Sequence, residues 1–175
     1  MERTVLRLSG SDTHKFLNDL VTNDLSGLND GLVYAAILTP QGKYLFDFFL
    51  AADGDAILLD VAAARAQALA QRLTMYKLRA DVTIEDSGLH VHRGLGAAPD
   101  GALADPRHAA LGWRMFADVA QQGDNVDWDA IRVAHCIPET GVELIADGSF
   151  ILECGFERLN GVDFRKGCYV GQEVT

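Results

Sequence analysis

The chain has 175 residues, of which 49% are hydrophobic and 23% charged, with a formal net charge of -10 at pH 7. This composition indicates a soluble globular protein with one sizeable domain or two small interleaved ones. The acidic balance argues against a general nucleic-acid binder, and no run approaches the roughly 18 apolar residues of a membrane span.

Three widely spaced cysteines, Cys136, Cys154 and Cys168, give an odd count without a C-x-x-C pair. A disulfide framework is therefore not expected, and the pattern is typical of a reducing compartment. On this basis we expect a cytoplasmic protein. Three cysteines also cannot supply the four thiolates that usually hold an iron–sulfur cluster, and we see no zinc-ligand spacing, so no metal site is expected.

The first half of the chain predicts strands interleaved with two helices. Alternating apolar residues predict a strand over 4–8, and apolar residues on one face predict a helix over 12–21. Two apolar runs around a Pro- and Gly-containing turn predict a hairpin over 32–50. A further strand is expected at 56–61, and an alanine-rich stretch predicts the clearest helix, over 62–78.

The second half predicts shorter strands, one helix and irregular connections. The strands are expected at 82–85, 89–92 and 111–116, and the irregular stretches at 94–107, 121–124 and 139–164. The helix is expected over about 126–136, with Asp124, Asn125 or Asp127 as its N-cap. Together these elements predict an α+β fold in which helices pack on an antiparallel sheet.

One carboxylate, Asp47, interrupts the apolar second strand of the expected hairpin. Strand alternation places it on the same face as Leu45 and Phe49, and places Tyr44 and Phe46 on the opposite face. Both faces are otherwise apolar, as in a covered central strand. A buried carboxylate is costly unless it is paired or hydrogen-bonded, so Asp47 is either held by structural hydrogen bonds or part of a functional site.

The last stretch of the chain, R-K-G-C-Y-V-G-Q-E, concentrates chemically useful groups. The thiol of Cys168 follows two cations, Arg165 and Lys166, and nearby positive charge favours the thiolate. Two glycines permit unusual backbone angles, and Gln172 and Glu173 add a mixed donor–acceptor and an acceptor. The alternative interpretation is a glycine-containing turn in which Cys168 is a small buried hydrophobic residue.

The string K-G-C-Y-V-G-Q-E resembles the signature of the YgfZ family, the folate-binding relatives of the glycine-cleavage T-protein. Shorter similarities are P-Q-G-K at 40–43, Y-x-L-R-x-x-V at 76–82 and D-P-R at 105–107. The resemblance covers nearly the whole chain. It implies a T-protein-like folate-binding fold over 1–175, as one unit or two interleaved subdomains, and it implies tetrahydrofolate as the cofactor.

The resemblance also implies roles for individual residues of the motif. Cys168 is the expected critical residue, and Lys166 is expected to promote its thiolate form. Gln172 and Glu173 are expected to organise the loop or contact the ligand. Glu153 matches the position of an acid that contacts the pterin ring in folate-binding relatives, and a carboxylate can accept two adjacent N–H groups of that ring.

Three further positions are compared with the family pattern. Tyr76 and Arg79 could face a folate ligand, although the preference of a helix C-terminus for cations also explains Arg79. Asp47 matches an acidic residue of the T-protein, but Phe46 stands where the T-protein has a second aspartate. This departure counts against aminomethyl-transfer chemistry. Cys136 stands where the family usually has glycine, which argues against a functional role for that thiol.

The leading hypothesis is therefore a tetrahydrofolate-binding accessory protein for iron–sulfur cluster assembly or repair, whose partners are iron–sulfur proteins or assembly factors. The alternatives are a folate-dependent aminomethyltransferase and a non-catalytic interaction module with the same fold, so enzymatic activity is left open. The family normally continues past the motif into a C-terminal β-barrel that these residues lack, and we expect a longer intact gene product.

Overall fold

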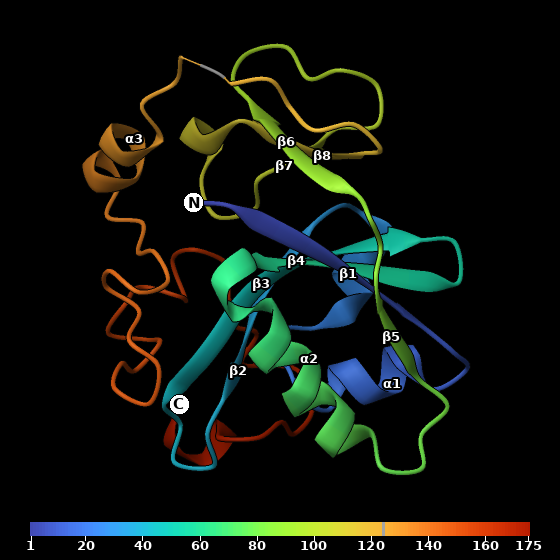
Figure 1. Ribbon diagram of the computed structural model, residues 1–175. Coiled ribbons are helices and arrows are strands. Elements are labelled where there is room, and N and C mark those ends of the chain that lie inside the picture. Colours follow the sequence, from blue (N-terminus) through green and yellow to red (C-terminus); the bar gives the residue numbers. More distant parts are fainter. Residues whose placement is uncertain (124) are drawn as a thin grey trace.

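The computed structural model describes residues 1–123 and 125–175 and has an α+β fold with antiparallel sheets (Figure 1). A five-stranded sheet has the order β2-β3-β4-β1-β5, and a three-stranded sheet has the order β6-β8-β7. The strands are β1 (Arg3–Ser9), β2 (Val33–Leu38), β3 (Tyr44–Asp53), β4 (Ala56–Ala62), β5 (Thr83–Asp86), β6 (His90–Gly94), β7 (Leu103–Ala104) and β8 (Trp113–Ala117). The predicted α+β class and the hairpin are confirmed.

The helices lie close to their predicted positions and are mostly shorter. They are α1 (Thr13–Asn18), α2 (Ala63–Lys77) and α3 (Trp128–Ala134), with the 3-10 turns η1 (Leu25–Asn29), η2 (Ala109–Leu111) and η3 (Gln172–Val174). Asp127 caps α3 by accepting a hydrogen bond from the amide of Ala130 at 2.9 Å. Of the two other caps considered, Asn125 lies before the N-cap position and Asp124 lies outside the described residues. None of the helices described here is long and apolar enough to cross a membrane.

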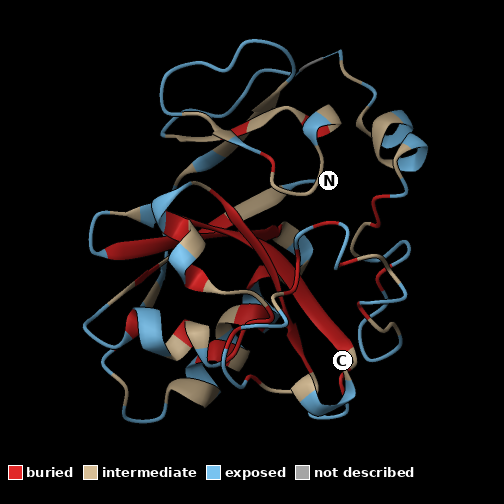
Figure 2. Ribbon diagram, turned by 180° about the vertical axis from the view of Figure 1, so that it is seen from behind, coloured by how far each residue is buried: buried red, intermediate tan, exposed pale blue. Residues whose placement is uncertain are grey.

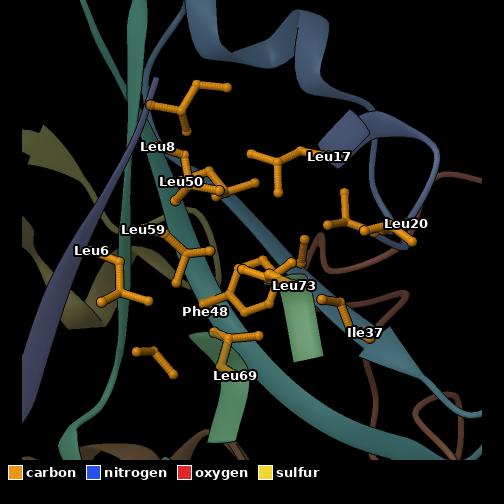
Figure 3. Close-up of a cluster of buried hydrophobic side chains, with 14 of the residues drawn as sticks. Leu6, Leu8, Leu17, Leu20, Ile37, Phe48, Leu50, Leu59, Leu69 and Leu73 are labelled. Atoms are coloured by element: carbon orange, nitrogen blue, oxygen red, sulfur yellow. The ribbon is translucent and has the colours of Figure 1, made fainter. Parts of the chain in front are cut away.

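Both faces of the five-stranded sheet are covered, which explains why its central strands are continuous apolar runs. All six residues of β2 and all seven of β4 are buried (Figure 2). On one face, Leu69 and Leu73 of α2 and Leu17 of α1 pack with Phe48 and Leu59 of the sheet (Figure 3).

The opposite face of the sheet is covered by a segment with little regular structure. Tyr34 and Phe49 of the sheet pack there with Ile151, Phe156 and Leu159. Residues 139–164 contain no helix or strand in the described chain, as expected from their composition. This segment connects α3 to the C-terminal motif, so the second core layer also positions the motif.

A β-bulge changes the face on which one predicted residue lies. Ile37 of β2 pairs with Phe46, whereas Leu38 pairs with Tyr44, so Leu45 is an extra residue in β3. Simple alternation therefore placed Tyr44 wrongly on the face opposite Asp47. The bulge brings Tyr44 to the side of Asp47, because one additional residue inverts the side-chain alternation that precedes it.

Candidate functional site

The C-terminal motif is held against the sheet by the segment that precedes it. The hydroxyl of Thr22 donates to the carbonyl of Gly161 at 2.7 Å. The amide of Asp163 donates to the carbonyl of Thr22 at 3.0 Å, and Asn23 Nδ2 donates to the carbonyl of Asn160 at 2.7 Å. Residues 160–163 are thus fixed to the turn that follows α1, which sets where the motif begins.

Lys166 extends this attachment into the interior. Its buried ammonium group donates to the carbonyls of Asn18 (2.6 Å), Val21 (2.5 Å) and Asn23 (3.1 Å). Burial lowers its pKa to about 8, while negative charges led by Asp24 act in the opposite direction. The lysine therefore satisfies the carbonyl of Asn18, the last residue of α1, and two carbonyls of the turn that follows the helix. Its expected effect on the thiol of Cys168 stays a prediction.

The thiol of Cys168 is exposed, so the alternative of a buried hydrophobic cysteine is wrong. The side chain of Arg165 is 94% exposed and lies 3.6 Å from a carboxylate oxygen of Asp163. Gln172 and Glu173 lie in η3, where Gln172 is partly buried and Glu173 is exposed. The motif therefore presents one thiol and several polar groups to the surroundings.

Gly171 is the motif glycine that the backbone requires. Its φ is +86°, and a Cβ atom there would lie 2.5 Å from the carbonyl oxygen of Thr39. A Cβ at Gly42 would in turn meet Val174 at 2.8 Å. The P-Q-G-K turn and the C-terminal motif are thus in close contact, whereas Gly167 faces open space.

Asp47 is buried, and its carboxylate accepts hydrogen bonds from three hydroxyl groups. Tyr34 donates to one oxygen at 2.9 Å, while Tyr44 donates to the other at 2.7 Å and Thr140 donates to that same oxygen. Burial, reinforced by the charge of Asp47, raises the pKa of Tyr44 and keeps its hydroxyl a donor. The structural hydrogen bonds that sequence analysis considered are therefore present.

A buried ionic network adjoins Asp47, and sequence analysis did not predict it. Arg3 Nε lies 2.6 Å from Asp60 Oδ1, and Arg114 Nη1 lies 2.8 Å from Asp60 Oδ2. Arg114 Nε also lies 3.0 Å from Asp105 Oδ2, which Arg107 Nη2 approaches to 2.8 Å. The signal in the sequence was Asp60, a lone carboxylate in an apolar strand, to which the reasoning used for Asp47 applies equally.

Because of this network, we expect the free energy of unfolding to decrease as the pH falls into the acidic range. Burial alone would raise the pKa of Asp105, but Arg107 and Arg114 outweigh it and lower that pKa to about 2. The unfolded carboxyl takes up a proton near pH 3.9, so about 2 kcal/mol of stability present above that pH is lost as the pH falls towards 2. Urea unfolding across this pH range measures the loss. An equal loss in Asp105→Asn would contradict its assignment to Asp105.

The predicted folate contacts do not form one site in the described chain. Tyr76 packs with the core on the α2 side of the sheet, and Arg79 is exposed beyond the end of α2. Asp47 lies on the opposite face, beside a cavity of only about 60 Å³. Ligand pockets typically measure about 300–1,000 Å³, so a folate ring system does not fit beside Asp47.

Glu153 is exposed and lines two larger surface depressions. One measures about 530 Å³ and includes Cys136 and Cys154 in its wall; the other measures about 320 Å³ and includes Gly42 and Val174. Across the described residues, no group of three or more His, Cys, Asp or Glu side chains is arranged to hold a metal ion.

The sequence is similar to those of proteins named as mitochondrial iron–sulfur cluster assembly factors. Over 99% of its length it is 32% identical to the IBA57 homolog of Mycosarcoma maydis, 32% to IBA57 of Mus musculus and 31% to IBA57 of Homo sapiens. It covers 51%, 59% and 59% of these proteins, respectively, and so spans little more than half of their length. No protein-family model matches the chain.

These names contradict the expected cytoplasmic location, because each describes a mitochondrial protein. The free cysteines indicated only a reducing compartment, and they do not distinguish one reducing compartment from another.

Among solved structures, the glycine-cleavage aminomethyltransferase T of Bartonella henselae is similar over 50% of this chain and 25% of that protein. The TM-score is 0.46 at 18% identity. A likeness this distant carries no argument by itself.

Proposed function

We propose that this chain is part of a YgfZ-type accessory protein for iron–sulfur cluster assembly and that it acts through Cys168. The similarity to named assembly factors along 99% of the chain supports the process. The exposed thiol supports the residue, because a thiolate must reach a metal or a client protein to act on it.

The position of Cys168 favours action on another molecule. Iron–sulfur clusters usually need four protein ligands, and the described residues hold no group of three ligand-type side chains suited to a metal. If the thiol of Cys168 binds iron, the other ligands come from outside the described residues. The anchored segment before it, held by Lys166 and Thr22, gives the thiol a defined starting position.

The three cysteines of the chain allow a matched test. The gene is expressed in cells that lack their own related assembly factor, and the activity of iron–sulfur enzymes is measured. We expect Cys168→Ala to reduce rescue to the level of an empty vector, because the transferred or coordinated group has no thiolate to bind. Cys136→Ala and Cys154→Ala are the controls and should rescue as the wild type does.

If Cys168→Ala rescues as well as the wild type at equal protein abundance, the proposed role of this thiol is wrong. Rescue by all three variants would point to a non-catalytic interaction module, whereas failure of all three would point to damage of the fold. Quantitative immunoblotting of each variant separates these results from a simple loss of protein.

Folate binding is part of the same proposal. The depression of about 320 Å³ that Glu153 lines together with Gly42 and Val174 is large enough for a pterin ring, and it includes neither Asp47 nor the control cysteines. Unchanged folate affinity in Glu153→Ala would exclude this placement. Aminomethyl transfer is not part of the proposal, because the Asp47 carboxylate is buried, accepts from three hydroxyl groups and borders a cavity of only about 60 Å³.

A further inference from the structure

The buried ionic network contains more guanidinium groups than carboxylates. Arg3 and Arg114 share Asp60, and Arg114 and Arg107 share Asp105. Three cations are therefore in direct contact with two anions. Asp47 adds a negative charge near Arg107, but its carboxylate accepts hydrogen bonds from hydroxyl groups and from none of these three arginines.

Each of these arginines also retains a nitrogen without a protein acceptor. Within the described residues, Arg3 Nη1, Arg107 Nη1 and Arg114 Nη2 make no hydrogen bond to the protein. These three nitrogens are not sealed from solvent. All three arginines line the cavity of about 60 Å³ beside Asp47. The cavity therefore has donors available for an acceptor that the chain does not provide.

The other charged groups around the cavity are already paired or engaged. Arg132 binds Asp129 at 2.9 Å and Glu139 at 3.1 Å. Asp47 accepts from three hydroxyl groups and faces the cavity as an additional negative charge. Arg93 lies over the ring of Trp128 at 4.3 Å. The excess of donors thus belongs to the Arg3, Arg107 and Arg114 group.

We propose that this cavity binds a small carboxylate anion of the size of formate. A carboxylate matches the paired N–H groups of guanidinium ions, and the cavity is too small for a larger organic ligand. Burial, with smaller contributions from the charges of Arg107 and Arg3, lowers the pKa of Arg114 to about 10 despite its two carboxylate partners. This inference is independent of the role proposed for Cys168.

An anion can reach the cavity from the surface. A wide depression of about 550 Å³ shares Met1, Arg3, Arg93 and Trp128 with the cavity wall. Because Trp128 lines both spaces, its indole N–H resonance should report occupancy.

The test titrates the protein with sodium formate and follows the thermal unfolding midpoint together with the indole resonance of Trp128. Chloride and sulfate at matched ionic strength form the comparison arms. We expect a saturable response to formate, which Arg107→Gln should weaken by about tenfold or more through loss of a charge-assisted hydrogen bond. Arg158→Gln is the control, because Arg158 donates to the carbonyls of His135 and Cys136 outside this cavity and should leave the response unchanged.

A second variant changes affinity in the opposite direction, which a purely structural role does not predict. Asp47→Asn removes the negative charge that faces the cavity and should tighten formate binding by about threefold or more. It also tests the proposal if Arg107→Gln fails to fold. The proposal is overturned if formate acts no differently from chloride at equal ionic strength, which would indicate a cavity filled by water. Unchanged or weaker formate binding by Asp47→Asn would overturn it as well.

Discussion

Replacing Asp60 by asparagine is expected to lower the free energy of unfolding by about 3 to 5 kcal/mol, the usual cost of removing one partner from a buried ion pair. Asp60 has a fully buried side chain and contacts both Arg3 and Arg114. Asparagine keeps the shape of the side chain but not its charge, so Arg3 would lose its carboxylate partner and Arg114 would retain Asp105 alone of its two. Urea unfolding followed by circular dichroism measures the change.

A second aspartate supplies the matched control for this substitution. Asp53, at the end of β3, pairs with Arg7 at 2.8 Å, but its side chain is 44% exposed. Because exposed ion pairs contribute little, Asp53→Asn should cost less than about 1 kcal/mol. Similar losses in the two variants would contradict the importance that we assign to the buried network.

Replacing Lys166 by methionine is expected to lower the free energy of unfolding by about 2 to 4 kcal/mol, because three carbonyl groups lose a charged donor. Asn18, Val21 and Asn23 provide these carbonyls. Methionine retains most of the apolar stem, so the change isolates the ammonium group. We also expect faster proteolysis near the motif, since the lysine attaches it to the turn after α1.

The same variant separates the two roles considered for Lys166. If the lysine also favours the thiolate, alkylation of Cys168 by iodoacetamide should slow when measured on the folded protein. If it acts only as an anchor, the alkylation rate of the folded protein should not fall. Lys15→Met is the control, since Lys15 is exposed in an i,i+4 pair with Asp19 and should change stability within about 0.5 kcal/mol. Unchanged stability in Lys166→Met would contradict the anchoring role.

Local pattern predicted the parts of the site that depend on near neighbours in sequence. The lone polar residue in an apolar strand indicated that Asp47 is buried and needs partners, and the structure provides Tyr34, Tyr44 and Thr140. Pattern could not identify Thr140, which lies 93 residues away. It also misplaced Tyr44, because a bulge is set by strand pairing and leaves no clear local signal.

The grouping of predicted ligand residues failed for a related reason. Tyr76 and Asp47 lie on elements that the sequence identified correctly, yet they face opposite sides of the five-stranded sheet. Which face of the sheet a helix or segment covers depends on how the layers stack. The sequence of that helix or segment alone does not specify it. Glu153 lies in an irregular segment, so helix or strand periodicity could not predict where its side chain points.

The sequence by itself determined the α+β class, the covered central strands, the hairpin and α2. For the last motif it left open whether Cys168 is exposed or buried, and the structure shows it exposed. These features follow from side-chain period and turn chemistry within a few residues. Only the tertiary structure decided that Lys166 caps the carbonyls after α1, that Gly171 packs against Thr39, and that three arginines share Asp60 and Asp105. Each of these contacts joins residues brought together by packing of separate layers, and its energy depends on burial that no local stretch of sequence specifies.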